Sequence, residues 1–415
     1  MKPRRRAARL WRLWLLPAIA LFLFSLFLRH HRTSSVLNDG ARIAYFIQVS
    51  AANLPLLNRL LLTIYDPSNF YALHLDLKID ELKALESMRS AYHVLSSRWG
   101  VGSERNVPNL LIVRSEIVTY RGATMTMNYL TGANRLLAGG DWDYFINLSG
   151  ADYPTASQKA IRRLLGKVGK GRNFVEWKPQ NTWMGFAEKR FGEFYVDTGL
   201  AKLKSSTSEF VDLNGTEVSK QVEGVERTMN PLFRELDFTI AKSSGWFILS
   251  REFCEHLRDD SDARKLLALL AFSDASDEHY FASVLWNGGD RWRGSVVNSN
   301  MRTIFFVAPN GSFAMGEDGQ RSRQHPFWVD EAGEDGVFLF GKHLKKSPGF
   351  FTRKVRGDGG FRDWMDREMM EKEYEERLEK RFDQAVMEAD RVRRLHQGAA
   401  QASEHSDASE DATSI

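Results

Sequence analysis

Hydrophobic positions along the first part of the chain follow two alternating patterns. Short runs rich in β-branched and aromatic residues predict buried strands at 43–49, 70–76, 109–114 and 144–149. Between them, apolar residues spaced three or four apart predict helices at 54–65, 80–97 and 123–137. This order predicts an α/β fold of the Rossmann type, a parallel sheet with helices on both faces. Such sheets bind ligands beyond the carboxyl ends of their strands.

The pattern is less regular after residue 166. Strands are expected at 173–177 and 246–250, and a helix is expected at 262–271. The polar stretch 205–228 predicts a loop. Dense charge of both signs over 361–396 predicts a solvated helix with one narrow apolar stripe. Residues 397–415 are rich in Ser, Ala and acidic residues, so we expect them to be disordered.

The amino-terminal segment predicts a membrane anchor. Residues 1–12 are basic, and residues 13–28 are apolar except for Pro17 and Ser25. As a helix this run spans about 24 Å, slightly short of a ~30 Å hydrocarbon core unless Leu10 and Trp11 are included. A cleaved signal peptide is the alternative, but the run leads directly into the basic sequence RHHR without a small-residue cleavage site. More positive charge lies before the run than after it, which predicts a cytoplasmic amino terminus.

The net charge of +4 divides unevenly along the chain. Residues 1–32 carry +8 and the remainder carries −4, so the sequence pI near 9.0 arises at the amino terminus and indicates no nucleic-acid partner. The single cysteine, Cys254, excludes an intrachain disulfide. With 43% hydrophobic residues, the chain can still build a large core without one.

An adjacent acidic pair stands out in the stretch SDASDEHYFASVLWN, residues 273–287. Asp277 and Glu278 precede an apolar stripe at helical spacing, and Ser276 is the expected N-cap of that helix. A carboxylate fixed at the start of a packed helix can serve as a general base. The alternative is that both acids only favour the positive end of the helix dipole.

This stretch resembles the acidic motif of the Core-2/I-branching enzyme family of glycosyltransferases. The family includes animal β-1,6-N-acetylglucosaminyl branching enzymes, peptide O-xylosyltransferases and plant β-glucuronosyltransferases. Other segments between about residues 42 and 355 resemble family motifs in the same order: FYALHLD, VTYRGATM, NLSGADYP, NFVEW, SSGWFILS and FTRKV. The resemblance implies a GT-A-like, Rossmann-type catalytic domain over 41–360. It differs from many animal members in its lack of cysteines.

The family resemblance assigns roles to seven residues. Glu278 is expected to be the catalytic base, and Glu176 and Trp246 are expected to bind the acceptor. The expected nucleotide-sugar ligands are Asp76, Asp152, Arg353 and Lys354.

The charge on the departing diphosphate could be neutralised in two ways. Asp141 and Asp143 form a DxD sequence of the kind that holds manganese in many sugar transferases, but they precede a strand, at the end opposite to the expected ligand site. The second way uses basic side chains, as in the metal-independent branching enzymes. One family arginine is replaced here by Asp335. The basic residues that could substitute are Lys342, Lys345 and Lys346.

The resemblance implies an inverting, metal-independent glycosyltransferase without a cofactor. It would transfer N-acetylglucosamine, glucuronic acid or xylose from a UDP-sugar to a glycan or glycoprotein hydroxyl. Together with the anchor, it implies a single-pass type II protein of the Golgi membrane, with residues 29–40 as a stem and a lumenal catalytic domain. The alternative is a catalytically degenerate carbohydrate-binding or scaffolding protein. Asn214 and Asn310 are the expected N-glycosylation sites.

Overall fold

The computed structural model describes residues 40–411 with internal gaps at 104, 179–189, 191–194, 198, 200–218, 222–237, 308–313, 316–320, 323–325, 330–339, 348 and 358–359. The expected cytoplasmic tail and anchor, and the expected stem as far as residue 39, lie outside these residues, as do Asn214, Asn310 and Asp335. None of the helices that the structure describes combines the length and apolar character needed to cross a bilayer.

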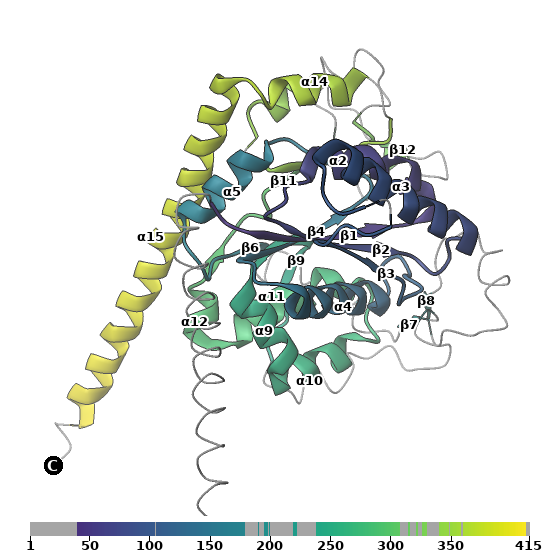
Figure 1. Ribbon diagram of the computed structural model, residues 1–415. Helices are drawn as coiled ribbons and strands as arrows, with labels where there is room; N and C mark the ends of the chain where they lie inside the picture. Colours follow the sequence, from purple (N-terminus) through teal and green to yellow (C-terminus); the bar gives the residue numbers. More distant parts are fainter. Residues whose placement is uncertain are drawn as a thin grey trace, which may run out of the picture. The chain divides into compact units, whose positions relative to one another are not determined.

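The described residues are built around a central sheet (Figure 1). Its strands follow the order β10-β6-β9-β4-β1-β2-β3. Their bounds are β1 (Ile43–Val49), β2 (Phe70–Leu75), β3 (Leu110–Val113), β4 (Tyr144–Ser149), β6 (Asn173–Lys178), β9 (Lys242–Ser250) and β10 (Val296–Val297). The first four strands are parallel to one another, as the sequence predicts.

Strand β9, for which the sequence predicts no direction, runs antiparallel to both of its neighbours, β4 and β6. Strand β6 ends at the carboxyl edge of the sheet, and β9 starts there, with Lys178 paired to Lys242. A strand that starts where its neighbour ends must run back across the sheet. The amino end of β9 therefore shares an edge with the carboxyl ends of β1, β2, β4 and β6.

Helices cover both faces of the sheet (Figure 1). One face carries η1 (Ala51–Leu56), α2 (Leu57–Ile64), α3 (Glu81–Trp99) and α5 (Gln158–Lys167). The other carries α4 (Ala123–Gly139), α9 (Arg251–Asp259), α10 (Ser261–Leu270), α11 (Tyr280–Asn287) and α12 (Gly289–Arg293). Helix α3 begins at Asp80, whose side chain accepts hydrogen bonds from the amides of Leu82 and Lys83, as expected of an N-cap.

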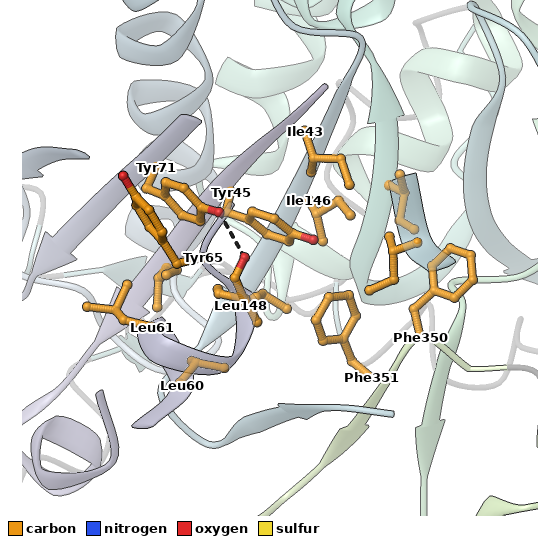
Figure 2. Close-up of a cluster of buried hydrophobic side chains, with 14 of the residues drawn as sticks. Ile43, Tyr45, Leu60, Leu61, Tyr65, Tyr71, Ile146, Leu148, Phe350 and Phe351 are labelled. Carbon is orange, nitrogen blue, oxygen red and sulfur yellow. Dashed lines mark hydrogen bonds between the residues drawn. The ribbon is translucent and has the colours of Figure 1, made fainter. Parts of the chain in front are cut away.

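Alternation along β1 divides the buried side chains between the two faces. Ile43, Tyr45 and Ile47 belong to the core beneath α2 and α3, whereas Ala44 and Phe46 belong to the core on the α4 face. Figure 2 shows the first core, in which the rings of Tyr45 and Tyr71 stack with centroids 5.5 Å apart. Burial on both faces explains why the strand reads as one continuous apolar run.

A second, three-stranded sheet lies at the carboxyl end of β4. It consists of β11 (Arg302–Ile304), β14 (Phe351–Arg353) and β5 (Asp152–Pro154), in that order. Strand β5 starts three residues after β4 ends, so the small sheet begins at the ligand-binding edge of the large one. Elsewhere two short antiparallel strand pairs occur, β7 (Tyr195–Asp197) with β8 (Ser219–Gln221), and β12 (Ala314–Met315) with β13 (Arg321–Ser322).

The carboxyl-terminal segment forms α14 (Gly360–Glu368) and α15 (Lys372–Asp411). Helix α15 presents the expected narrow stripe, since Tyr374, Leu378 and Phe382 are buried. The helix is assigned as far as Asp411, and the expected disorder of 397–415 stays a prediction.

Candidate active site

The acidic pair lies in a short 3-10 turn, η4 (Ser276–Glu278), immediately before α11. The expectation that Ser276 caps the helix is wrong. Its hydroxyl lies 2.8 Å from the hydroxyl of Thr126 on α4, and the turn begins instead at Ala275, which has a left-handed backbone (φ 54°). The apolar stripe of α11 is buried as predicted, so η4 is fixed against the second core.

Two cations bind the carboxylate of Glu278. Nζ of Lys242 donates to its Oε2 at 2.5 Å, and Nη1 of Arg190 donates to the same oxygen at 2.6 Å. Burial opposes ionisation of the carboxyl, but Lys242 and Arg190 outweigh it and lower the pKa of Glu278 to about 2. The carboxylate is therefore ionised, and its side chain remains one-third exposed (33%).

Asp277 occupies a different environment although it is the next residue. Its carboxyl is buried against the backbone of Gly245 in β9, where an added Cβ would lie 2.2 Å from Oδ2. Burial, followed by the charge of Glu278, raises the pKa of Asp277 to about 7. The environments of the two neighbouring acids thus shift their pKa values in opposite directions.

One face of β9 connects the acidic pair with the other expected site residues. Lys242, Ser244 and Trp246 alternate with the buried residues between them, so their side chains share a face. Lys242 binds Glu278, as described above. Ser244 is linked to Glu176, because Nδ2 of Asn300 lies 2.8 Å from the Ser244 hydroxyl and 3.0 Å from the Glu176 carboxylate.

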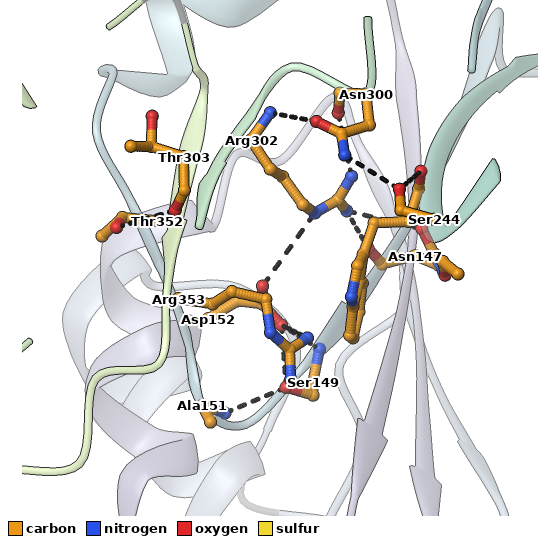
Figure 3. A network of polar contacts seen from close by, with 12 residues as sticks. Asn147, Ser149, Ala151, Asp152, Ser244, Asn300, Arg302, Thr303, Thr352 and Arg353 are labelled. Atoms are coloured by element: carbon orange, nitrogen blue, oxygen red, sulfur yellow. Dashed lines mark hydrogen bonds and ion pairs between the residues drawn. The ribbon is translucent and has the colours of Figure 1, made fainter. Parts of the chain in front are cut away.

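The far end of this face reaches the small sheet. Strands β5 and β14 pair Asp152 with Arg353, and Nη1 of Arg353 lies 3.4 Å from Oδ2 of Asp152 (Figure 3). The guanidinium of Arg353 stacks on the ring of Trp246, 3.8 Å from the ring centroid. The structure therefore brings Glu278, Glu176, Trp246, Asp152 and Arg353 to one edge of the sheet.

Arg302 also belongs to this cluster, although sequence reasoning did not select it. Its side chain is completely buried; its guanidinium lies 5.2 Å from the Trp246 ring and its Nε lies 3.9 Å from Oδ1 of Asp152. Within the described part of the chain, Nε of Arg302 and Oδ1 of Asp152 have no hydrogen-bond partner. A single arginine within the otherwise apolar run MRTIFF was the available signal, because a charge in a buried strand needs a partner.

The remaining expected nucleotide-sugar ligands, Lys354 and Asp76, have other contacts. Lys354 follows Arg353, and its Nζ lies 5.2 Å from the ring centroid of Trp328. Asp76 follows β2 and accepts hydrogen bonds from the amides of Lys78 (2.8 Å) and Val118 (3.3 Å). Burial raises the pKa of Asp76 despite these bonds and the nearby Lys78. Both residues thus lie after strands, where ligands are expected.

Three lysines, Lys342, Lys345 and Lys346, are the proposed substitutes for the family arginine. Of these, Lys345 has its Nζ 2.7 Å from the carboxylate of Glu368 on α14. The DxD residues lie at the opposite, amino-terminal end of β4, as expected. Oδ2 of Asp141 binds Arg42 at 2.5 Å, and Asp143 binds Lys170 at 2.8 Å. Both carboxylates therefore form ion pairs at the amino-terminal edge of the sheet.

The fold and this edge together define the class of protein. A mixed α/β domain with a Rossmann-type sheet and one reversed strand is consistent with a GT-A-like glycosyltransferase domain. A sequence model of the Core-2/I-Branching enzyme family matches residues 43–329. The chain therefore belongs to the Core-2/I-branching enzyme family of glycosyltransferases, and the expected family membership is confirmed.

Similar proteins fall into two groups. The chain is 28% identical over 335 residues to beta-glucuronosyltransferase GlcAT14B of Arabidopsis thaliana, covering 79% of this chain and 66% of that protein. It is 30% identical over 278 residues to beta-glucuronosyltransferase GlcAT14A of the same plant, covering 66% and 56%. Human xylosyltransferase 2 is 25% identical over 255 residues, 60% of this chain and 25% of that protein. The chain thus spans two-thirds or less of these relatives.

Proposed function

We propose that this protein is an inverting glycosyltransferase that transfers a sugar from a UDP-sugar to a hydroxyl of a glycan or glycoprotein. The observation that carries the proposal is the shared face of β9. Its residues connect a carboxylate, Glu278, with a stacked guanidinium, Arg353, on the ligand-binding edge of the sheet. Lys242 binds the carboxylate, and Trp246, four residues further along the strand, stacks against the guanidinium.

The proposed chemistry needs no covalent intermediate. Glu278 accepts the proton of the acceptor hydroxyl as its oxygen attacks the anomeric carbon, and the bond from that carbon to the UDP oxygen breaks on the opposite face. Arg353 and Lys354 stabilise the negative charge that develops on the departing diphosphate. Asp76 and Asp152 orient the nucleotide sugar, and Glu176 and Trp246 bind the acceptor.

We further propose glucuronic acid as the first donor to test, ahead of N-acetylglucosamine and xylose. The segments VTYRGATM and FTRKV favour the plant β-glucuronosyltransferase group, and GlcAT14A and GlcAT14B carry that activity in their names. Metal independence is supported by the ion pairs of Asp141 and Asp143 at the opposite edge. The basic residues 1–12, followed by the apolar run 13–28, support a Golgi-membrane location.

A panel of UDP-glucuronic acid, UDP-N-acetylglucosamine and UDP-xylose tests the proposal. Each donor is mixed with the purified protein and glycan or glycopeptide acceptors, and both released UDP and sugar-extended product are measured. We expect one donor, UDP-glucuronic acid first, to give product with an inverted anomeric configuration. Retention of configuration, or absence of product with all three donors, would contradict the proposal.

A second candidate is a carbohydrate-binding protein without turnover. One observation favours it: the two cations on Glu278 lower the pKa of its carboxyl to about 2, which reduces its strength as a base. This candidate predicts that UDP or glycans bind in calorimetry while no sugar is transferred under any donor of the panel.

A further inference from the structure

The backbone is left-handed at two residues that contact each other beside the acidic pair. Arg121, just before α4, has a φ of 65°, and Ala275, just before η4, has a φ of 54°. The amide of Ala275 donates to the carbonyl oxygen of Arg121 at 2.7 Å. Non-glycine residues rarely adopt this conformation, because Cβ then crowds the following carbonyl oxygen. They keep it where surrounding contacts impose it, and such positions cluster at functional sites.

The contact that imposes it is a two-pronged ion pair between Arg121 and Asp274. Nε of Arg121 donates to Oδ1 of Asp274 at 2.8 Å, and Nη2 binds Oδ2. The Asp274 side chain is only 9% exposed, so its charge requires a partner. Two parallel hydrogen bonds fix both the distance and the direction between a guanidinium and a carboxylate. Arg121 therefore fixes the chain immediately before η4.

The chain that Arg121 holds leads to Glu278 and contacts one of its cations. The amide of Asp274 donates to the carbonyl oxygen of Arg190 at 3.1 Å, and Nη1 of Arg190 binds Glu278. Two residues further on, the hydroxyl of Ser276 lies 2.8 Å from that of Thr126 on α4. A displacement of this short stretch would therefore move the proposed base and one of the cations that bind it.

The family segment VTYRGATM anchors Arg121 in turn. Oδ1 of the buried Asp197 accepts a hydrogen bond of 2.6 Å from the Thr119 hydroxyl. Its Oδ2 accepts hydrogen bonds from the amide and the hydroxyl of Thr124, at 2.8 and 2.7 Å. Gly122 leaves room for this carboxylate, since an added Cβ would lie 2.2 Å from Oδ2. These bonds fix the start of α4 on both sides of Arg121.

We infer that Arg121 is a positioning residue, whose ion pair with Asp274 sets the place of the Glu278 carboxylate. It acts through the backbone, because Lys242 and Arg190 supply the side chains that bind Glu278. The expected effect on rate rests on the proposed transferase function, whereas the expected effect on the turn does not. Loss of this contact should slow the transfer step and leave the binding of UDP unchanged.

Arg121→Met tests the inference, because it removes the ion pair and keeps a long side chain. With the donor that the panel identifies, at saturating concentration, single-turnover transfer should slow at least about tenfold. The Kd for UDP should stay within about threefold of the wild type. Arg121→Lys, which keeps the charge, should lose less. Adding Asp274→Asn to Arg121→Met should slow transfer by less than about twofold more, because the two side chains act as one unit.

Hydrogen exchange tests the position of the turn without turnover. The amide of Ala275 donates to Arg121, and the amide of Glu278 donates to the carbonyl oxygen of Ala275 at 3.0 Å. In Arg121→Met both amides should exchange at least about tenfold faster, relative to the amides of β1, which report global unfolding. Unchanged relative exchange would overturn the inference.

Arg162→Met is the matched control. It removes another ion pair, that of Arg162 on α5 with Asp66 at 2.8 Å, on the face of the sheet opposite to η4. It should lower stability in urea and leave both transfer and the relative exchange of the turn unchanged. Unchanged transfer in Arg121→Met, or the same loss in both arginine variants, would overturn the inference. Faster exchange at the turn, with no transfer by the wild type, would support the inference and overturn only the proposed function.

Discussion

The ammonium group of Lys242 lies 2.5 Å from Oε2 of Glu278, the carboxylate that we propose as the base. On folding, the pKa of this carboxyl falls from its ordinary value of 4.5 to about 2, because Lys242 and Arg190 outweigh the effect of burial. The ion pairs therefore stabilise the native protein above about pH 4.5, and this stabilisation is lost as the pH falls toward 2. The same contact sets the pH range in which the base is ionised.

Lys242→Met should raise the pKa of Glu278, since one of two cations is lost. We expect the acidic limb of the kcat/KM profile to move upward by about one pH unit. Lys170→Met is the matched control, because it removes a lysine that binds Asp143 at the opposite edge of the sheet. An unshifted limb in the Lys242 variant would show that Glu278 does not control this titration.

Asp277 provides a prediction of opposite sign. Its pKa is raised on folding from 3.8 to about 7, so the native state holds a proton that the unfolded chain releases between these values. The free energy of unfolding should therefore fall as the pH rises through this window. Asp277→Asn should remove that fall. The difference in unfolding free energy between the variant and the wild type should therefore rise by at least about 1 kcal/mol in favour of the variant between pH 5 and pH 8. Parallel pH–stability curves for variant and wild type would contradict the assigned environment.

Arg353 is expected to bind the diphosphate of the donor. Arg353→Ala should raise the Kd for UDP at least about tenfold, because it removes a charge-assisted contact and leaves Asp152 with one cation fewer. Calorimetry with UDP measures the change. Arg291→Ala removes an arginine that also stacks on a tryptophan, Trp292, but lies on α12, and it should bind UDP like the wild type. Equal effects of both variants would contradict a specific role for Arg353.

Asp143 should affect stability and not catalysis. Its Oδ2 accepts a hydrogen bond of 2.8 Å from the Arg42 amide, and Oδ1 binds Lys170. Asp143→Asn should lower the free energy of unfolding by about 1 kcal/mol, as measured by urea denaturation. Transfer by the variant and by the wild type should persist in excess EDTA. Loss of transfer on chelation would establish a metal requirement instead.

The repeating half of the sheet was predictable because its central strands, β1 and β4, are buried on both faces. The observed bounds of β1 and β4 match the predicted 43–49 and 144–149, since burial imposes an uninterrupted apolar run. The reversal of β9 was not predictable in this way. An antiparallel strand buried on both faces has the same composition as a parallel one. Its direction depends on the edge of the sheet at which the preceding segment ends.

The residues of the candidate site that belong to a family motif were predictable. Asp152, Arg353 and Trp246 come from separate motifs, and the structure places them together through strand pairing and one stacked contact. The partners of the carboxylate were not predictable. Arg190 and Lys242 reach Glu278 from 88 and 36 residues away in sequence. No local pattern reports such contacts, because they depend on how the chain returns to the edge of the sheet.

The central claim is that the carboxylate of Glu278 takes the proton of the acceptor. Glu278→Gln keeps the size of the side chain and removes the base. With the donor that the panel identifies, single-turnover transfer should fall at least about a thousandfold, while calorimetry gives a Kd for the UDP-sugar within about threefold of the wild type. Wild-type transfer by the glutamine variant would contradict the account.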